Sequence, residues 1–172
     1  MKQVSEEVYY ANQNLVQVDY QKIKILKEKS IDTHRKRNRL CVHKDVDDLL
    51  HEMLIIHAKD AYVKPHKHLK KSESFHLIEG EVNVIIFEED GQVKDVIQMG
   101  DYLSGKVFYY RISDSLYHTL VITSDILVFH ETTRGPFDRE DTIFAPWSPV
   151  ENDVVGMALF QERLNQEIQR FL

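Results

Sequence analysis

The spacing of hydrophobic and polar positions divides the chain into a central part and two ends. From His51 to Thr133, short runs rich in Val, Ile, Phe and Tyr alternate with turn residues such as Gly80 and Asp90-Gly91. Short apolar runs between turn signals are typical of β-strands. We predict strands over residues 52–58, 61–66, 74–79, 81–88, 93–98, 106–112, 117–122 and 126–132.

The two ends of the chain contain near-helical spacing. Asp19 is a suitable N-cap for a helix over about 20–29, and Leu159, Leu164 and Ile168 indicate a second helix over roughly 153–171. Residues 1–18 alternate loosely, as in an early strand, and the basic segment 33–39 is expected to face solvent. This order of elements predicts an all-β barrel or jelly roll with helical additions at both termini.

The domain organisation follows from these boundaries. A chain of 172 residues suits a single domain. We divide residues 1–172 into an N-terminal extension with its helix (1–50), a β-barrel core (51–133), and Pro-containing loops followed by the C-terminal helix (134–172).

Composition narrows the classes of partner. Lys and Arg number 22 against 28 Asp and Glu, for a net charge of −6, so no nucleic-acid partner is expected. No apolar run reaches the roughly 18 residues of a membrane span, and the first residues lack the apolar core of a signal peptide. Cys41 is the single cysteine, which excludes a disulfide within the chain. These features favour a cytoplasmic protein.

The chemistry is concentrated in the segment His66-Lys67-His68, followed by Glu73 and Gly80. Residues two apart on a strand face the same side, so His66 and His68 can present two imidazoles to one ion. Glu73 can bring a carboxylate to the same point from the start of the next strand, and Gly80 permits a tight turn after it. We therefore predict one bound divalent metal ion, such as Zn, Fe, Mn or Ni.

This spacing resembles the first motif of the cupin superfamily, with Asp60 in place of its leading glycine. Gly100 opens and His118 ends a counterpart of the second cupin motif, in which Ser113 and Ser115 replace the usual Pro and Gly. The resemblance implies a cupin double-stranded β-helix, that is, a jelly-roll barrel. It also implies that His118 is the fourth metal ligand.

A finer resemblance extends over about residues 35–150. Its elements are Arg37-x-Arg39-x-x-x-His43, Tyr62-Val63-x-Pro65-His66-x-His68, Phe87-x-x-x-Gly91, Gly135-Pro136-Phe137 and Ala145-Pro146-Trp147-Ser148-Pro149. Together they resemble the WbuC family of cupin-fold metalloproteins, although Cys41 stands where that family is expected to have Asn. The resemblance implies a link to bacterial O-antigen or capsule gene clusters and hence to sugar chemistry, but it implies no particular reaction.

Strand parity identifies further candidates for a cavity beside the metal. Tyr62 and Lys64 share the parity of His66 and His68, and Arg111 offers a guanidinium suited to an acid group. We expect Tyr62, Lys64 and Arg111 to bind a small, sugar-like and anionic ligand.

Four other strand residues bear on the cavity. His76 is expected to face away from it, because Glu73, Phe75 and Leu77 face inward. At most one of His130 and Glu131 can line the cavity, because neighbouring residues on a strand face opposite sides. His57 can face either the cavity or the outer side of its strand.

Three functions fit this site, and the catalytic residue is unknown. The first is a metal-dependent isomerase or epimerase acting on a sugar, sugar phosphate or nucleotide-sugar. The second is an iron-dependent oxygenase, and the third is a non-catalytic metal- and sugar-binding scaffold or regulatory protein. A dedicated base outside the metal shell would favour the isomerase, and an apolar cavity without such a base would favour oxygen chemistry. The apolar strand faces also suggest a homodimer.

Overall fold

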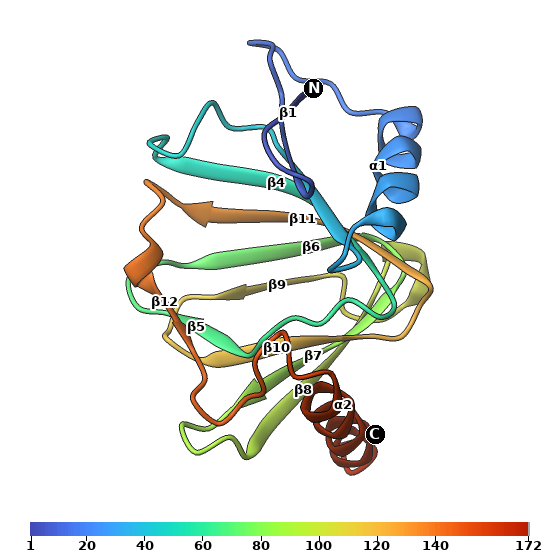
Figure 1. Ribbon diagram of the computed structural model, residues 1–172, viewed down its shortest axis with the longest axis vertical. Coiled ribbons are helices and arrows are strands. Elements are labelled where there is room, and N and C mark those ends of the chain that lie inside the picture. The colour runs from blue at the N-terminus through green and yellow to red at the C-terminus, as the bar shows by residue number, and fades with distance from the viewer. Residues whose placement is uncertain (172) are drawn as a thin grey trace.

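Two β-sheets face each other in the computed structural model, which describes residues 1–171 (Figure 1). The larger sheet has the order β1-β2-β3-β4-β11-β6-β9 and the smaller one β12-β5-β10-β7-β8. The larger sheet consists of β1 (Lys2–Gln3), β2 (Val8–Tyr10), β3 (Arg37–Cys41), β4 (Leu50–Ala58), β11 (Ile126–Arg134), β6 (Glu73–Glu79) and β9 (Tyr109–Ile112). The smaller sheet consists of β12 (Thr142–Phe144), β5 (His66–His68), β10 (Tyr117–Ile122), β7 (Glu81–Phe87) and β8 (Val93–Gly100). Neighbouring strands are antiparallel except β2 and β3, which are parallel.

One helix covers the outer face of each sheet (Figure 1). Helix α1 (Tyr20–Asp32) packs Leu26 against the larger sheet, and α2 (Val154–Ile168) packs Phe160 and Leu164 against the smaller one. Asp19 caps α1, since its side chain accepts a hydrogen bond from the backbone N–H of Lys22 at 2.9 Å. Two short 3₁₀ turns, Tyr102–Ser104 and Arg139–Asp141, complete the regular structure.

The main hydrophobic core lies between the sheets. The sequence of strand β7 is almost continuously apolar because both of its faces are covered. Val82, Val84 and Ile86 face this core, whereas Ile85 and Phe87 face the opposite side, toward α2. A strand covered on both faces has no solvated face to carry polar residues. Gly80 connects β6 to β7 with a φ of +94°, and a Cβ atom there would lie 2.2 Å from the carbonyl oxygen of Ile126. The tight turn therefore requires glycine.

The predicted all-β class with helical ends is confirmed, but the N-terminal extension differs from the prediction. The basic segment 33–39 was expected to face solvent, whereas β3 begins at Arg37 and pairs with β4, which buries Asn38 and Leu40. The prediction is confirmed for His34, Arg35 and Arg39, which are exposed, and wrong for Thr33 and Asn38, which are buried. The strand that buries Asn38 was missed because the alternation of residues 37–41 is short and lies within a run of charged residues. Residues 61–65 are irregular rather than a strand, and β12 was not predicted. No helix within residues 1–171 is long and apolar enough to cross a lipid bilayer.

Candidate metal centre

Four side chains converge between the sheets at the end of the molecule where β6 begins and β11 ends, on the left in Figure 1. His66 and His68 lie on β5, Glu73 is the first residue of β6, and His118 lies on β10 directly opposite His66. One nitrogen or oxygen atom from each of the four lies within 4.8 Å of the others. The structure therefore brings together the four residues that the sequence predicted as ligands.

Backbone hydrogen bonds orient two of the imidazoles. His66 Nδ1 lies 2.9 Å from the carbonyl oxygen of Lys64, and His118 Nδ1 lies 3.0 Å from the carbonyl oxygen of Leu116. A carbonyl only accepts, so each Nδ1 carries the proton and each Nε2 keeps a free lone pair. This arrangement is the one by which proteins fix metal-binding histidines.

The other two members of the cluster are also held by polar contacts. His68 Nδ1 lies 3.1 Å from Thr142 Oγ1, and its Nε2 lies 3.2 Å from Glu73 Oε2. The second carboxylate oxygen of Glu73 accepts a hydrogen bond from the Tyr110 hydroxyl at 3.2 Å. Glu73 Oε1 is also 3.6 Å from His118 Nε2. Tyr110 thus positions a candidate ligand.

The protonation states suit metal binding. Burial lowers the pKa of His66 to about 3, with a further contribution from His118, so this imidazole is neutral at pH 7. Burial alone would raise the pKa of Glu73, but the neighbouring His118 and His68 more than offset it and the pKa falls to about 2. Neutral imidazoles and an ionised carboxylate are the forms that bind a divalent ion. The donor set is compatible with the metal site typical of cupins and suits Zn, Fe, Mn or Ni.

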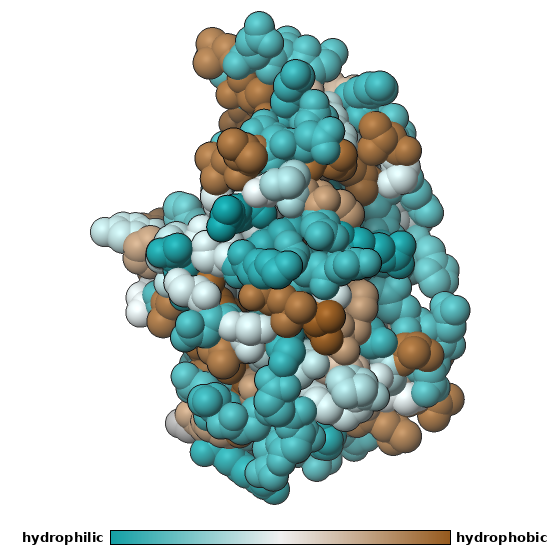
Figure 2. Space-filling view, turned by 90° about the vertical axis from the view of Figure 1, so that its left-hand side faces the viewer, coloured by the Kyte–Doolittle hydropathy of each residue, from teal (hydrophilic) through white to brown (hydrophobic). Residues whose placement is uncertain are grey.

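A cavity of about 430 Å³ adjoins the four side chains. Beyond the cluster, its walls come from β3, β4 and β11 of the larger sheet and from β12. The loop end of the molecule beside it is mostly hydrophilic, with hydrophobic residues in small separate groups (Figure 2). A cavity of this size is in the range for a small-molecule site.

Glu131 on β11 is a half-buried carboxyl group that lines the cavity outside the four-residue cluster. Burial, together with the nearby Glu73, raises its pKa to about 8, although the charge of Arg39 opposes this shift. Its neighbour His130 faces the other side of the sheet, where its Nε2 lies 3.8 Å from Glu52. The prediction that at most one of this pair lines the cavity is confirmed. His57 also lines the cavity, and His76 is exposed as expected.

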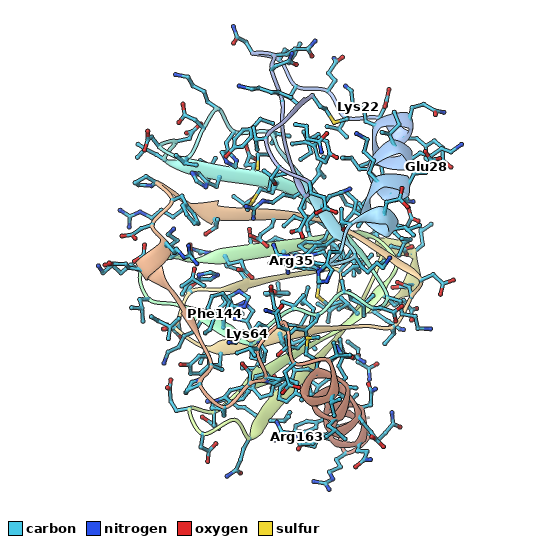
Figure 3. The ribbon with its side chains drawn as sticks, viewed as in Figure 1. Lys22, Glu28, Arg35, Lys64, Phe144 and Arg163 are labelled. Carbon is cyan, nitrogen blue, oxygen red and sulfur yellow. The ribbon has the colours of Figure 1, made fainter. Side chains whose placement is uncertain are left out.

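Of the three residues expected to bind a ligand, Lys64 lines the cavity. Its ammonium nitrogen lies 5.3 Å from the ring centroid of Phe144, and Figure 3 labels the two side by side below Arg35. Tyr62 instead packs toward α2, and its hydroxyl donates to the carbonyl oxygen of Pro149 at 3.0 Å. Since residues 61–65 are irregular, strand parity does not apply there, and Val63 faces the cavity.

Arg111 does not face the cavity either. It is exposed on the outer side of β9, where its Nη2 lies 3.3 Å from Ser72 Oγ, and Tyr110 takes the inward position. The expectation that Arg111 faces the cavity was wrong because the choice of inward face on β9 was reversed.

The N-terminal extension also lines the cavity, which was not predicted from the sequence. Arg37, Arg39 and Cys41 on β3 line it, together with His43 just beyond that strand. The signal was present, because these four positions alternate with a period of two.

Sequence comparison gives one family match. Residues 18–99 match a sequence family described as a domain of unknown function, DUF6016. No curated protein matches the chain.

Three solved structures illustrate the structural likeness. Protein SO0799 from Shewanella oneidensis superposes with a TM-score of 0.51 at 10% identity, covering 73% of this chain and 77% of that one. Oxalate decarboxylase from Bacillus subtilis gives 0.50 at 17% identity, covering 75% and 34%. The cupin domain of Cnp3 from Schizosaccharomyces pombe gives 0.46 at 12%, covering 59% and 66%. At these identities the likeness concerns the fold alone, and the chain has a cupin fold with two added helices.

Proposed function

We propose that the protein is a metal-dependent isomerase or epimerase that acts on a sugar, sugar phosphate or nucleotide-sugar. Its metal ligands are His66, His68, Glu73 and His118. The observation that carries the proposal is Glu131, a half-buried carboxyl group in the wall of the same cavity and outside the ligand set. A potential base outside the metal shell favours the isomerase over the oxygenase, for which an apolar cavity without such a base is expected.

The chemistry requires a proton carrier beside a polarised carbonyl or hydroxyl. A divalent ion held by the four ligands would supply that polarisation. The ionised Glu131 carboxylate takes a proton from the carbon next to the carbonyl. As the acid it returns the proton to the opposite face of that carbon, which gives the epimer, or to the former carbonyl carbon while the hydroxyl proton passes to the former carbonyl oxygen, which gives the isomer. No oxidant, reductant or water is consumed. A pKa of about 8 suits both steps near neutral pH, because a useful fraction of each form is present.

The class of substrate rests on two supports. The resemblance to the WbuC family indicates bacterial surface polysaccharide biosynthesis, either O-antigen or capsule. The polar wall of the cavity, which includes Arg39, Lys64 and His57, suits a hydroxylated and anionic small molecule. Both supports agree on a sugar-like ligand.

Deuterium exchange tests the proposed reaction. Metal-loaded protein in D₂O is incubated with hexose 6-phosphates and with nucleotide-sugars, and NMR follows deuterium at carbons next to the carbonyl. We expect exchange with the wild-type protein and its loss in Glu131→Gln, with metal content unchanged in both. Iron in the purified protein and uptake of O₂ without exchange would replace the isomerase by the oxygenase. A metal-loaded protein that binds sugars without exchange would support the scaffold.

The oligomeric state is part of the same proposal. Several large apolar side chains are exposed on β6, on β9 and on the segment before β9, and they would form the contact of a homodimer. They are Ile78, Tyr102, Leu103, Val107, Phe108 and Tyr109. We expect light scattering to give twice the chain mass for the wild-type protein and the mass of one chain for Leu103→Asp. A wild-type monomer at high protein concentration would contradict the dimer.

A further inference from the structure

Basic residues outnumber acidic ones in the cavity wall, although the whole chain is acidic. The chain has a net charge of −6. Five basic residues line the cavity, namely Arg35, Arg37, Arg39, Lys64 and Lys71. The acidic residues that line it are Glu7, Glu73, Glu131 and Glu151. Since Glu73 belongs to the candidate metal cluster, few carboxylates remain to balance the basic groups.

Three of the five basic residues already have carboxylate partners. Arg35 lies 2.6 Å from Glu7 and 3.0 Å from Glu151, and Arg37 lies 3.4 Å from Glu7. Lys71 is 3.8 Å from Asp141.

Arg39 and Lys64 are the two cavity cations without an ion pair among residues 1–171. Lys64 lies beside the Phe144 ring, which gives its charge a favourable contact. Arg39 lies on β3 near Tyr10, Cys41 and His43, and its charge also acts on the carboxyl group of Glu131. Its planar guanidinium is the group best suited to bind a carboxylate or phosphate through two parallel hydrogen bonds.

The position of Arg39 sets the distance between the acid group and the reacting end of a ligand. β3 is separated from β6, which carries Glu73, by β4 and β11, so the two strands lie roughly 14 Å apart at about 4.8 Å per strand. An acid group bound at Arg39 is therefore remote from the four-residue cluster. The side chains of Arg39 and of the four candidate ligands extend from their strands into the cavity, so the ligand itself spans less than the distance between the strands. A hexose that reacts at carbon 1 and carries its acid group on carbon 6 has two ends that can be bound separately, whereas the adjacent carboxylates of oxalate cannot reach both places.

We propose that Arg39 binds the carboxylate or phosphate at the far end of the sugar whose carbonyl end lies at His66, His68, Glu73 and His118. This inference rests on the proposed function, because both ends of the ligand occupy the same cavity. It assigns the recognition of charge to the N-terminal extension, and it places the proton carrier, Glu131, between the two ends of the ligand along the sheet.

Calorimetry with three probes tests the proposal. Glucose 6-phosphate, glucuronate and glucose are titrated into the full-length, metal-loaded protein and into protein treated with EDTA. We expect at least one of the two anions to bind the wild-type protein, and to bind Arg39→Gln at least tenfold more weakly. Arg39→Lys should lose part of this affinity, since a lysine cannot form the paired contact. The matched control is Arg111→Gln, which removes an equal charge from the outer face of β9 and should leave binding unchanged.

Each result bears on the proposal. A preference for glucose 6-phosphate over glucuronate assigns a phosphate, and the reverse assigns a carboxylate. No binding of either anion to the wild-type protein would overturn the proposal, as would equal losses in Arg39→Gln and Arg111→Gln. A loss in Lys64→Gln without a loss in Arg39→Gln would also overturn it. Anion binding that depends on Arg39 in protein that takes up no metal would uphold the inference and refute the metal-dependent reaction, so the two failures are distinguishable.

Discussion

Glu131 on β11 lies one diagonal step from Glu73 on β6. Thr133 is the direct cross-strand partner of Glu73, and Phe75 is the direct partner of Glu131, so the two carboxyl groups are offset by two residues on one face of the sheet. Diagonal neighbours of this kind are roughly 7–8 Å apart. Glu131 is thus close enough to act on a ligand at the four-residue cluster while it remains outside the cluster itself.

This relationship predicts how Glu131→Gln changes stability with pH. The usual pKa of a glutamate is 4.5, and burial raises that of folded Glu131 to about 8. The folded state therefore binds more protons than the unfolded state between these values, so wild-type stability falls as the pH rises through that window. Glutamine does not titrate, so the free energy of unfolding of the variant relative to the wild type should increase by at most about 1.4 kcal/mol per pH unit. This increase should level off above about pH 8. Urea denaturation in EDTA measures this difference.

The comparison has an internal check. Near pH 4.5 the two proteins should have similar stability, because the neutral carboxyl group and the amide are nearly the same size. A stability difference that is constant from about pH 5 to pH 8 would show that the Glu131 carboxyl titrates normally.

Alanine substitution of the paired histidines tests the metal site. His66→Ala and His68→Ala should each remove most of the bound metal, because each deletes one of four ligands. Elemental analysis of the purified variants measures this. Metal should also stabilise the wild-type protein, by roughly 2.7 kcal/mol at a hundred times its dissociation constant, and stabilise the variants little. His76→Ala on the exposed face of β6 is the control, and unchanged metal in all three variants would eliminate the site.

Tyr110→Phe should weaken metal binding without abolishing it. The Tyr110 hydroxyl donates a hydrogen bond to Glu73, and loss of such a supporting contact typically costs 10–100-fold in metal affinity. Competition with a chelator measures the affinity. Tyr109→Phe removes the same hydroxyl from the exposed face of the same strand and should have no effect. Equal affinities in the two variants would remove Tyr110 from the site.

The cluster could be predicted from sequence because its spacing is local. His66, His68 and Glu73 lie within eight residues, and the period of a strand places the first two on one side. The resemblance to cupins added His118, which no local pattern connects to them. The fold class was accessible for a similar reason, since turn residues divide the central strands clearly.

The rest of the cavity depends on tertiary pairing. Whether Tyr110 or Arg111 faces inward is decided by the register of β9 against β6, and both choices satisfy the alternation of the strand. The run of basic residues was assigned to solvent, where such runs usually lie, but Arg37 is half-buried and both it and the exposed Arg39 line the cavity. Ion pairs with Glu7 and Glu151, distant in sequence, keep Arg35 and Arg37 at the cavity wall.

Those ion pairs support a last prediction, that Glu7→Gln destabilises the protein more than Glu151→Gln. The Glu7 side chain is 16% exposed and accepts hydrogen bonds from both Arg35 and Arg37, whereas that of Glu151 is 37% exposed. We expect a loss of about 1.5–3 kcal/mol for Glu7→Gln, the range for hydrogen bonds to charged groups, and at most about 1 kcal/mol for Glu151→Gln. Burial alone would raise the pKa of Glu7, but Arg35 and Arg37 have the larger combined effect and hold it below its usual value of 4.5. The contribution of Glu7 is therefore complete above about pH 4.5 and is lost as the pH falls below that value. Urea denaturation at neutral and acidic pH measures both effects, and a larger loss for Glu151→Gln would contradict the assignment of Glu7 as the centre of this network.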